Sequence, residues 1–545
     1  MSSSGRDGTS LNSPGDPAPF VASGKGKWMA LLAALLGWMF DGLEMGLFPL
    51  VARPALKDLL QTTDDGQVGL WLGIMTAAFL VGAATGGVVF GWLGDRVGRV
   101  RAMTLSVLTY TVFTGLCGVA GSAEQVFLFR FIAALGMGGE WSLGVSLVME
   151  IWPNRSRAWL AGLIGAAANV GFLTIAVVSI GLTEIIGSLE QLLRATPLPD
   201  EWVTALVANS GWRLLMMFGA APALLTFFIR LFVPESERWL HEHDSGSTSN
   251  WAVKDLAGVV IGGLGPFLIV YLWAFDHPFG LENPFAVRLI GSAFGLALAF
   301  FGYVFPVHRY LERAAAGTGV QMSLTTRQIL GRMLIGACLS GTALIGTWGS
   351  VQWAPSWADQ LAQKDHAKQA ELAASTEISV EEANKPSGKI DAKAYTQIVT
   401  GIGAIIGTIL AAFMGNWFGR RISYTMLCLG SLASAQWFFR TNDQFDGMFL
   451  VGAFLVGAVT ASFYGWLPLY LPELFPTRVR ATGQGFAFNF GRILAAIAAL
   501  QTGYLMKEIF NGSYSAACSV ISFVYLVGVV IIWFAPETNG QELPE

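Results

Sequence analysis

Two stretches of the chain, EIWPNRSRA at 150–158 and ELFPTRVRA at 473–481, are copies of one another. Five of their nine positions are identical at a constant offset of 323 residues. A second pair, GWLGDRVGR at 91–99 and the degenerate AFMGNWFGR at 412–420, agrees with this offset within two residues. Repetition on this scale predicts that the chain consists of two related halves in parallel orientation, as in many secondary transporters.

The composition places both halves in a membrane. Of 545 residues, 53% are hydrophobic and only 13% are charged, against roughly 25% charged residues in soluble domains. The mean hydropathy is +0.54, and the net charge is −4 without any basic tract. These values exclude an ordinary soluble protein and leave no electrostatic footprint for nucleic acid. We therefore predict an all-α polytopic membrane protein.

Apolar stretches long enough to cross a hydrocarbon core occur fourteen times. They lie at 28–52, 68–92, 102–121, 125–149, 158–185, 212–233, 256–275, 286–306, 329–354, 398–417, 423–439, 447–470, 484–505 and 516–535. The predicted organisation is a disordered cytoplasmic tail at 1–27, six-helix halves at 28–236 and 327–538, an inserted two-helix segment at 237–326 and a cytoplasmic tail at 539–545. The segment 363–397 could form a short outer helix or none.

The distribution of Lys and Arg sets the predicted orientation. Placing the N-terminus inside puts eighteen of the 33 basic residues at inner ends or loops and seven at short outer loops. Both termini are then cytoplasmic, in the cell membrane, or the inner membrane if the source is bacterial. Arg130 and Arg492 fall within spans, where a charge costs roughly 2.5 to 3.5 kcal/mol. Each therefore needs a partner or a water-filled cavity.

The motifs resemble those of the major facilitator superfamily over nearly the whole chain. GWLGDRVGR is similar to the family's loop between helices 2 and 3. VPESERWL at 233–240 and PETNG at 536–540 are similar to the ends of helices 6 and 12 in members related to sugar porters. The resemblance implies a major facilitator fold, here with two extra helices between the halves.

A finer resemblance points to organic-acid:proton symporters. Asp41-Gly-Leu-Glu44 resembles their paired-acid motif, although the second acid is more often Asp, and Arg130 followed by GMGGEW at 136–141 resembles them too. The two inserted crossings resemble the fourteen-helix plan of the sialic-acid:proton branch. Span 329–354 lacks the glutamine-rich pattern of sugar porters. The fifth span lacks the Gly-Pro signature of antiporters, which favours symport.

Asp41, Glu44 and Arg130 are the candidate coupling residues. The two acids are three positions apart and share one helix face. At 1.5 Å per residue, Asp41 lies about 10 Å below the outer surface and Arg130 about 9 Å below it. We expect Asp41 and Glu44 to take the coupling proton and the freed Arg130 to bind a substrate carboxylate. The alternative is a structural ion pair that locks the helices together.

Polar and aromatic residues of the second half are candidates for substrate contact. Asn489 and Arg492 are again three apart and lie near mid-depth. The resemblance implies that the helices carrying the other candidates face the cavity, and an interfacial belt is the alternative interpretation. These other candidates are Gln352, Trp353, Tyr464 and Trp466.

Charged residues of the repeated motifs are predicted to form a conformational latch at the inner face. Glu150 is expected to pair with Arg157, and Glu473 with Arg480, in bridges weak enough to break during alternating access. Positive-inside topology alone is the alternative, and Glu140 is either an inner gate or a packing group. The predicted latch residues are Asp95, Arg96, Arg99, Glu140, Glu150, Arg157, Glu473 and Arg480.

These patterns together predict a proton-coupled symporter of a small carboxylated metabolite. Sialic acid or another sugar acid is preferred, followed by lactate-like or aromatic acids. The alternatives are a neutral sugar porter and a non-transporting nutrient sensor. The five His and four Cys show no catalytic or metal-binding spacing, so we expect neither an enzyme nor a cofactor beyond the coupling proton. The predicted partners are the substrate and the bilayer, and the predicted state is a monomer.

Overall fold

A computed structural model describes most of the chain between residues 24 and 544. The stretches outside the description are 1–23, 63–64, 153–155, 222–224, 226–227, 230–231, 276, 283, 318–323, 376–391 and 545. Helix α1 begins at Gly24, so residues 24–27 are helical and not part of a tail, while the rest of the predicted tail lies outside the described residues. The described part contains helices, turns and loops, and no strand.

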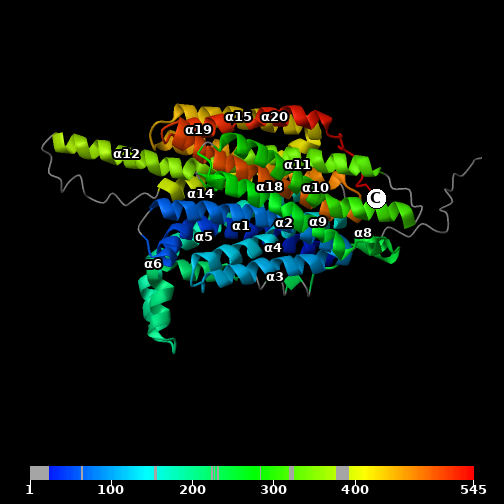
Figure 1. Ribbon diagram of the computed structural model, residues 1–545, viewed down its shortest axis with the longest axis horizontal. Helices are drawn as coiled ribbons and strands as arrows, with labels where there is room; N and C mark the ends of the chain where they lie inside the picture. The colour runs from blue at the N-terminus through cyan, green and yellow to red at the C-terminus, as the bar shows by residue number, and fades with distance from the viewer. Residues whose placement is uncertain are drawn as a thin grey trace, which may run out of the picture.

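Long helices run side by side along one direction (Figure 1). The first half comprises α1 (Gly24–Leu60), α2 (Asp65–Val97), α3 (Arg99–Cys117), α4 (Ala123–Ile151), α5 (Arg157–Arg194) and α6 (Asp200–Phe218). The second comprises α11 (Thr326–Trp348), α12 (Ala354–Ser375), α14 (Ala392–Phe418), α15 (Arg420–Thr441), α16 (Gly447–Ala461), α17 (Phe463–Tyr470), α18 (Arg480–Tyr504), α19 (Tyr514–Ile521) and α20 (Val524–Ile531). Between them lie α8 (Glu237–Asp244), α9 (Leu256–Ala274) and α10 (Phe285–Gly317).

Eleven helices of the described residues are long and apolar enough to cross a membrane. They account for eleven of the fourteen predicted spans. Of the other three, 212–233 is only partly described, and 423–439 and 484–505 form most of α15 and α18. Helix α18 is less apolar because it carries Asn489 and Arg492, and these side chains are buried against other helices. Helix α18 therefore matches the predicted span 484–505 even though two buried polar side chains lie within it.

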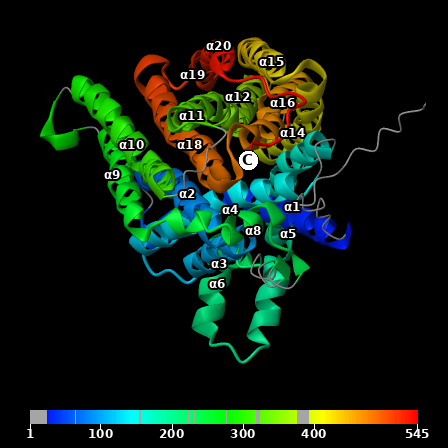
Figure 2. The ribbon, with the colours of Figure 1, turned by 90° about the vertical axis from the view of Figure 1, so that its right-hand side faces the viewer.

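The two halves face each other, and the inserted helices lie at the side of their junction (Figure 2). Helices α9 and α10 pack on one another, and the Tyr303 hydroxyl of α10 lies 2.7 Å from the Thr85 hydroxyl of α2. The Phe267 ring of α9 lies 5.5 Å from Phe131 of α4. On the second half, Phe300 of α10 contacts Phe486 and Phe490 of α18. The insert therefore contacts both halves.

The repeated motifs gather at one end of the bundle, which we call the repeat end. In each half a carboxylate caps the helix that begins after the last glycine of the motif, which is Gly98 in GWLGDRVGR and Gly419 in its copy. Glu235 accepts a hydrogen bond from the backbone N–H of Arg99 at 2.8 Å, and Glu537 accepts one from that of Arg420 at 2.9 Å. Because the first N–H groups of a helix have no partner within it, the glutamates of VPESERWL and PETNG satisfy the starts of α3 and α15.

Helix α18 joins the second half to the first at the repeat end. The Asn489 amide donates to the Gly138 carbonyl oxygen of α4 at 2.9 Å. Closer to the repeat end, Gln484 donates to the Ser142 carbonyl oxygen and to the Ser146 hydroxyl. These buried contacts close the junction on this side of the molecule.

Asp95 and Glu150 complete this closure with charge-assisted hydrogen bonds. Asp95 accepts from the Thr482 backbone N–H at 2.8 Å and from its hydroxyl at 2.6 Å. Glu150 forms ion pairs with Arg480 at 2.9 Å and with Arg99 at 3.3 Å. The carboxylates belong to the first half, and Thr482 and Arg480 belong to the second. A negative charge at the start of α18 also complements its helix dipole.

The pairing within this network differs from the predicted one. Glu150 pairs with Arg480 instead of Arg157, and Glu473 pairs with Arg420 at 2.8 Å instead of with Arg480. The reason is the closed junction, which places the start of α18 against the end of α4. Arg157 lies near Glu473, where the two interact electrostatically. Arg96 was also a predicted latch residue, and its guanidinium lies over the ring of Trp92, 5.1 Å from the ring centre.

The C-terminal segment after α20 takes part in the same closure. Leu543 is buried in the core that both halves share, and the Pro544 carbonyl oxygen accepts a hydrogen bond from Arg480 at 2.8 Å. Thr538 donates to Glu473 at 2.6 Å. Residues 539–544 thus lie against the repeat end, whereas the sequence predicted only a cytoplasmic tail.

Gly98→Ala should destabilise the protein. Gly98 has φ 113° and ψ 152°, and an added Cβ would lie 2.4 Å from the Glu235 carboxylate. Strain of this kind costs about 1–3 kcal/mol, so we expect a lower midpoint of thermal unfolding in detergent. Gly331→Ala, in the open interior of α11, is the matched control and should leave the midpoint unchanged or raise it. Equal midpoints for the two variants would contradict this account.

Asp95→Asn should open the repeat end. Losing the carboxylate charge weakens its bonds to Thr482 by about 1–3 kcal/mol, which is about fivefold or more in the ratio of closed to open states. The measurement is the rate of thiol labelling at Ser146→Cys, a position buried in the closed junction. Asn416→Ala alters the exposed counterpart of Asp95 in the second half and should not change the rate. An unchanged rate in Asp95→Asn would refute the latch.

Candidate functional site

Four charged side chains are buried in the middle of the bundle. Asp41 and Glu44 belong to α1, Arg130 to α4 and Arg492 to α18, and their exposed fractions are 0, 1, 2 and 4%. A buried charge is costly unless a partner compensates it. The partners of these four groups therefore indicate what the site can do.

Glu44 and Arg130 form a direct ion pair. Their Oε1 and Nη1 atoms are 2.9 Å apart, and the Thr114 hydroxyl donates to the same oxygen at 3.4 Å. The rings of Phe48 and Phe79 cover the guanidinium, with centres 4.0 and 5.3 Å from its carbon. The sequence placed the acid pair of α1 and Arg130 at similar depths, and the ion pair between Glu44 and Arg130 agrees with that. A guanidinium that is paired and covered in this way is held in place by the first half alone.

Asp41 and Arg492 face each other without forming an ion pair. They interact electrostatically, but no contact within 4 Å joins them. In the described part of the chain, the two carboxylate oxygens of Asp41 have no hydrogen-bond partner, and the Nη1 of Arg492 has none either. The sequence predicted Asp41 beside Arg130, whereas the structure places it opposite the arginine of the other half. This pair spans the junction between the halves.

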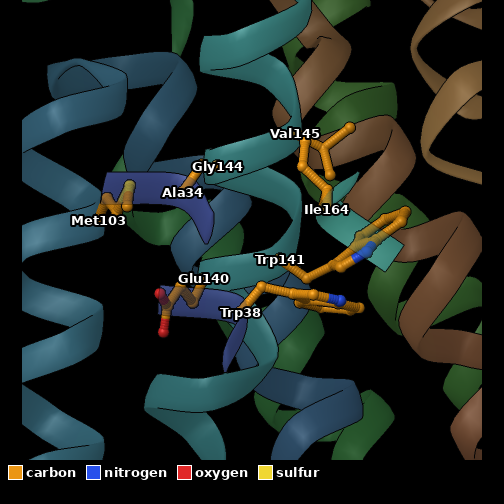
Figure 3. Close-up of a pocket in the computed structure, with 8 residues that line it drawn as sticks. All are labelled: Ala34, Trp38, Met103, Glu140, Trp141, Gly144, Val145 and Ile164. Carbon is orange, nitrogen blue, oxygen red and sulfur yellow. The ribbon is translucent and has the colours of Figure 1, made fainter. Parts of the chain in front are cut away.

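Glu140 lies in the site and not in the latch. Its carboxylate fits against the backbone of Gly37, where an added Cβ would lie 1.6 Å from Oε1. Gly37 is one helical turn before Asp41 on α1, and Asp41 and Glu140 interact electrostatically. Figure 3 shows the Glu140 carboxylate pointing away from the two indole rings beside it. The structure therefore adds a third acid to Asp41 and Glu44.

Aromatic rings from both halves form a layer on the repeat-end side of Asp41 and Arg492. Trp141 of α4 stacks on Phe488 of α18 with ring centres 3.9 Å apart, and Trp38 lies 5.8 Å from Trp141. Tyr464 touches the edge of this layer, and its hydroxyl lies 2.7 Å from that of Thr347. The indole N–H groups of Trp38 and Trp141 have no partner among the described residues. We call these four rings the aromatic floor.

Other predicted substrate contacts lie elsewhere. Trp466 is fully buried in the core of the second half, beside Tyr424 and Tyr470. Gln352 is exposed, and the Trp353 ring lies 6.0 Å from that of Tyr514, outside the central cluster. These three residues do not join the site. Asn489 is committed to the Gly138 carbonyl, so only its Oδ1 stays without a partner in the described part.

Of the aromatic floor, sequence reasoning named Tyr464 and missed Trp38, Trp141 and Phe488, and it also missed the position of Glu140. A signal was present, because Trp38 precedes Asp41 by three residues and Phe488 precedes Arg492 by four, spacings that share a helix face. Among the described residues, no group of three or more His, Cys, Asp or Glu is placed to hold a metal ion. The side chains that the site contains are carboxylates, guanidinium groups and aromatic rings.

Comparison with known proteins identifies the fold and the class of function. The family model for "Sugar (and other) transporter" matches residues 29–259 and 389–545. The cis,cis-muconate transport protein of Acinetobacter baylyi is 24% identical over 93% of this chain and 94% of its own length. A niacin transporter of the same organism is 23% identical over 95% and 96%. The sialic acid transporter NanX of Escherichia coli is 23% identical over 85% and 83%.

Solved structures show the same architecture. The proton:xylose symporter XylE of the major facilitator superfamily matches with a TM-score of 0.60 at 17% identity, over 96% of this chain and 98% of that one. The human organic anion transporter MFSD10 matches with a TM-score of 0.57 at 14% identity, over 93% and 99%. The chain therefore belongs to the sugar (and other) transporter family and is a membrane transporter with the major facilitator fold.

Proposed function

We propose that this transporter is a proton-coupled symporter of a small carboxylated metabolite. The observation that supports this most directly is that Asp41 and Arg492 interact electrostatically across the junction of the halves without forming an ion pair. A guanidinium without an ion-pair partner in a buried site is a receptor for a carboxylate, to which it can donate two parallel hydrogen bonds.

The proposed coupling depends on competition for Arg492. An ionised Asp41 neutralises this guanidinium at short range, whereas a protonated Asp41 leaves it available to the substrate carboxylate. Proton and anion then cross together, because the site is electrically balanced only when both are present or both are absent. Arg130 was the predicted anion receptor, and its pairing with Glu44 at 2.9 Å favours Arg492 for that role.

The closed repeat end supports alternating access around this site. The bonds of Asp95 and Glu150 to the second half, together with the aromatic floor, seal the site from one side. In the proposed orientation the repeat end faces the cytoplasm. Opening requires these bonds to break together while each half moves as a body.

The relatives support an organic acid as substrate. Muconate, niacin and sialic acid, named for three of them, all carry a carboxyl group. The aromatic floor beneath Arg492 offers ring faces on which a planar acid or the apolar face of a sugar acid can stack. Within this class, sialic acid or another sugar acid and planar acids such as nicotinate are the proposed substrates.

Uptake into proteoliposomes tests the proposal. Labelled sialic acid, muconate, nicotinate, lactate and xylose are presented with and without an inward proton gradient. We expect gradient-driven accumulation of at least one acid, because protonation of Asp41 favours anion binding. Asp41→Asn should abolish accumulation while exchange of internal for external substrate continues. Gradient-independent uptake of xylose alone, or intact accumulation in Asp41→Asn, would overturn the proposal.

Arg492→Lys tests the receptor assignment. Lysine keeps the positive charge but loses the planar pair of donors, so we expect KM for the transported acid to rise about tenfold, which corresponds to about 1.4 kcal/mol. Arg440→Lys makes the same change at an exposed position in α15 and should leave KM unchanged. If both variants retain the wild-type KM, Arg492 is not the carboxylate receptor.

A further inference from the structure

Glu140 is a buried acid that the coupling scheme above does not use. Its side chain sits in the interior of α4 with 2% of the residue exposed. Both carboxylate oxygens lack a hydrogen-bond partner among the described residues, and no ion pair reaches them. An ionised carboxylate is strongly disfavoured in such surroundings, so a purely structural role would leave the group without a compensating interaction.

The groups that face Glu140 are acidic or weakly acidic. Asp41 lies beside it on α1, and Tyr110 approaches from α3 with a buried hydroxyl that also has no partner in the described part. Glu44 lies on the same face of α1 but is paired with Arg130. Arg492 of α18 acts on Asp41. Two neighbouring carboxyl groups that form no ion pair can share one proton, because charging both at close range in a dry site is costly.

A small cavity adjoins Glu140 on the side away from Glu44. Ala34, Met103 and Gly144 line it together with Glu140, Trp38 and Trp141 (Figure 3). Its volume is about 10 Å³, enough for about one water molecule. Ala34 precedes Asp41 by seven residues, so this wall of the cavity lies about 10 Å from Asp41 along α1, on the repeat-end side. It lies within the first half, behind the aromatic floor and apart from Arg492.

We propose that Glu140 receives the coupling proton from Asp41 and releases it toward the repeat end through this cavity, by a route separate from that of the substrate. The inference rests on the proposed function and deepens it. In the transfer, the O–H bond of the Asp41 carboxyl group breaks as an O–H bond forms on the Glu140 carboxylate. No electrons are exchanged and no further reactant is needed, since water in the cavity accepts the proton from Glu140.

This proton transfer explains why the substrate is released. Asp41 becomes charged as soon as it passes its proton to Glu140, and its carboxylate then competes with the substrate for Arg492. The proton leaves behind the aromatic floor while the anion leaves through the junction of the halves. The close fit of Glu140 against Gly37 holds the two carboxyl groups near each other and makes the transfer short.

Glu140→Gln is the test, in proteoliposomes with the acid that wild-type protein accumulates in the uptake panel. We expect gradient-driven accumulation and the accompanying proton influx, followed with a trapped pH dye, to fall at least tenfold. Exchange should stay within twofold of wild type, which also shows that the variant is folded. Glu124→Gln removes an exposed acid from the start of the same helix and should change neither quantity.

A second variant and a spectroscopic measurement keep the outcome decisive. Gly37→Ala displaces the Glu140 carboxylate without removing it and should weaken coupling in the same direction. Infrared difference spectra between acidic and alkaline pH should contain a buried carboxyl band that responds to both Glu140→Gln and Asp41→Asn, but not to Glu124→Gln.

Intact accumulation in Glu140→Gln, or a carboxyl band that responds to Asp41→Asn alone, would overturn the inference and leave the proposed function standing. If Glu140→Gln lost both exchange and accumulation, the inference would also be overturned, because Glu140 would then serve the substrate site itself. Absence of gradient-driven uptake by the wild-type protein would instead overturn the proposed function.

Discussion

Burying charge in the middle of the bundle is unfavourable, and the rest of the structure depends on how this is compensated. Glu44 and Arg130 compensate each other with an ion pair inside the first half. Asp41, Glu140 and Arg492 do not form such pairs, and Asp41 and Arg492 lie on opposite sides of the junction between halves. A paired cluster would favour one rigid arrangement, whereas an incompletely compensated one changes its energy with each proton or anion that binds. In the proposed transport cycle, the helices around this cluster move.

The repeat end is where charged and polar side chains hold the two halves together. Its bonds run between halves, from Asp95 to Thr482 and from Glu150 to Arg480, so they are lost when the halves separate there. The duplication is unequal in this respect. Asn416 occupies the place of Asp95 in the second half, is exposed, and accepts hydrogen bonds at 3.3 Å from Arg420 and Asn539 of the same half. The charged copy of the motif therefore carries the contact between halves, and the neutral copy stays within its own half.

Sequence reasoning succeeded where local spacing fixes geometry. The repeat at an offset of 323 residues predicted two halves, and Glu44 and Arg130 meet because helical rise sets the depth of each. It failed where the answer depends on which helices pack together. Glu150 was assigned to Arg157, seven residues away, but pairs with Arg480 of the other half. Trp466 was assigned to the site because the resemblance implied that its helix faces the cavity, but its side chain is buried in the core of the second half.

By itself, the sequence determined the membrane environment, the helices, the duplication and the transporter family, because hydropathy and motifs are local properties that survive in any packing of the chain. Only the tertiary structure decided the electrostatic partners. Whether Asp41 faces Arg130 or Arg492, and whether Glu140 belongs to a latch or to a shared acid pair, depends on the rotation and contact of helices far apart in the chain. A side chain's direction around its helix follows from the sequence, but the group that it meets there follows from packing.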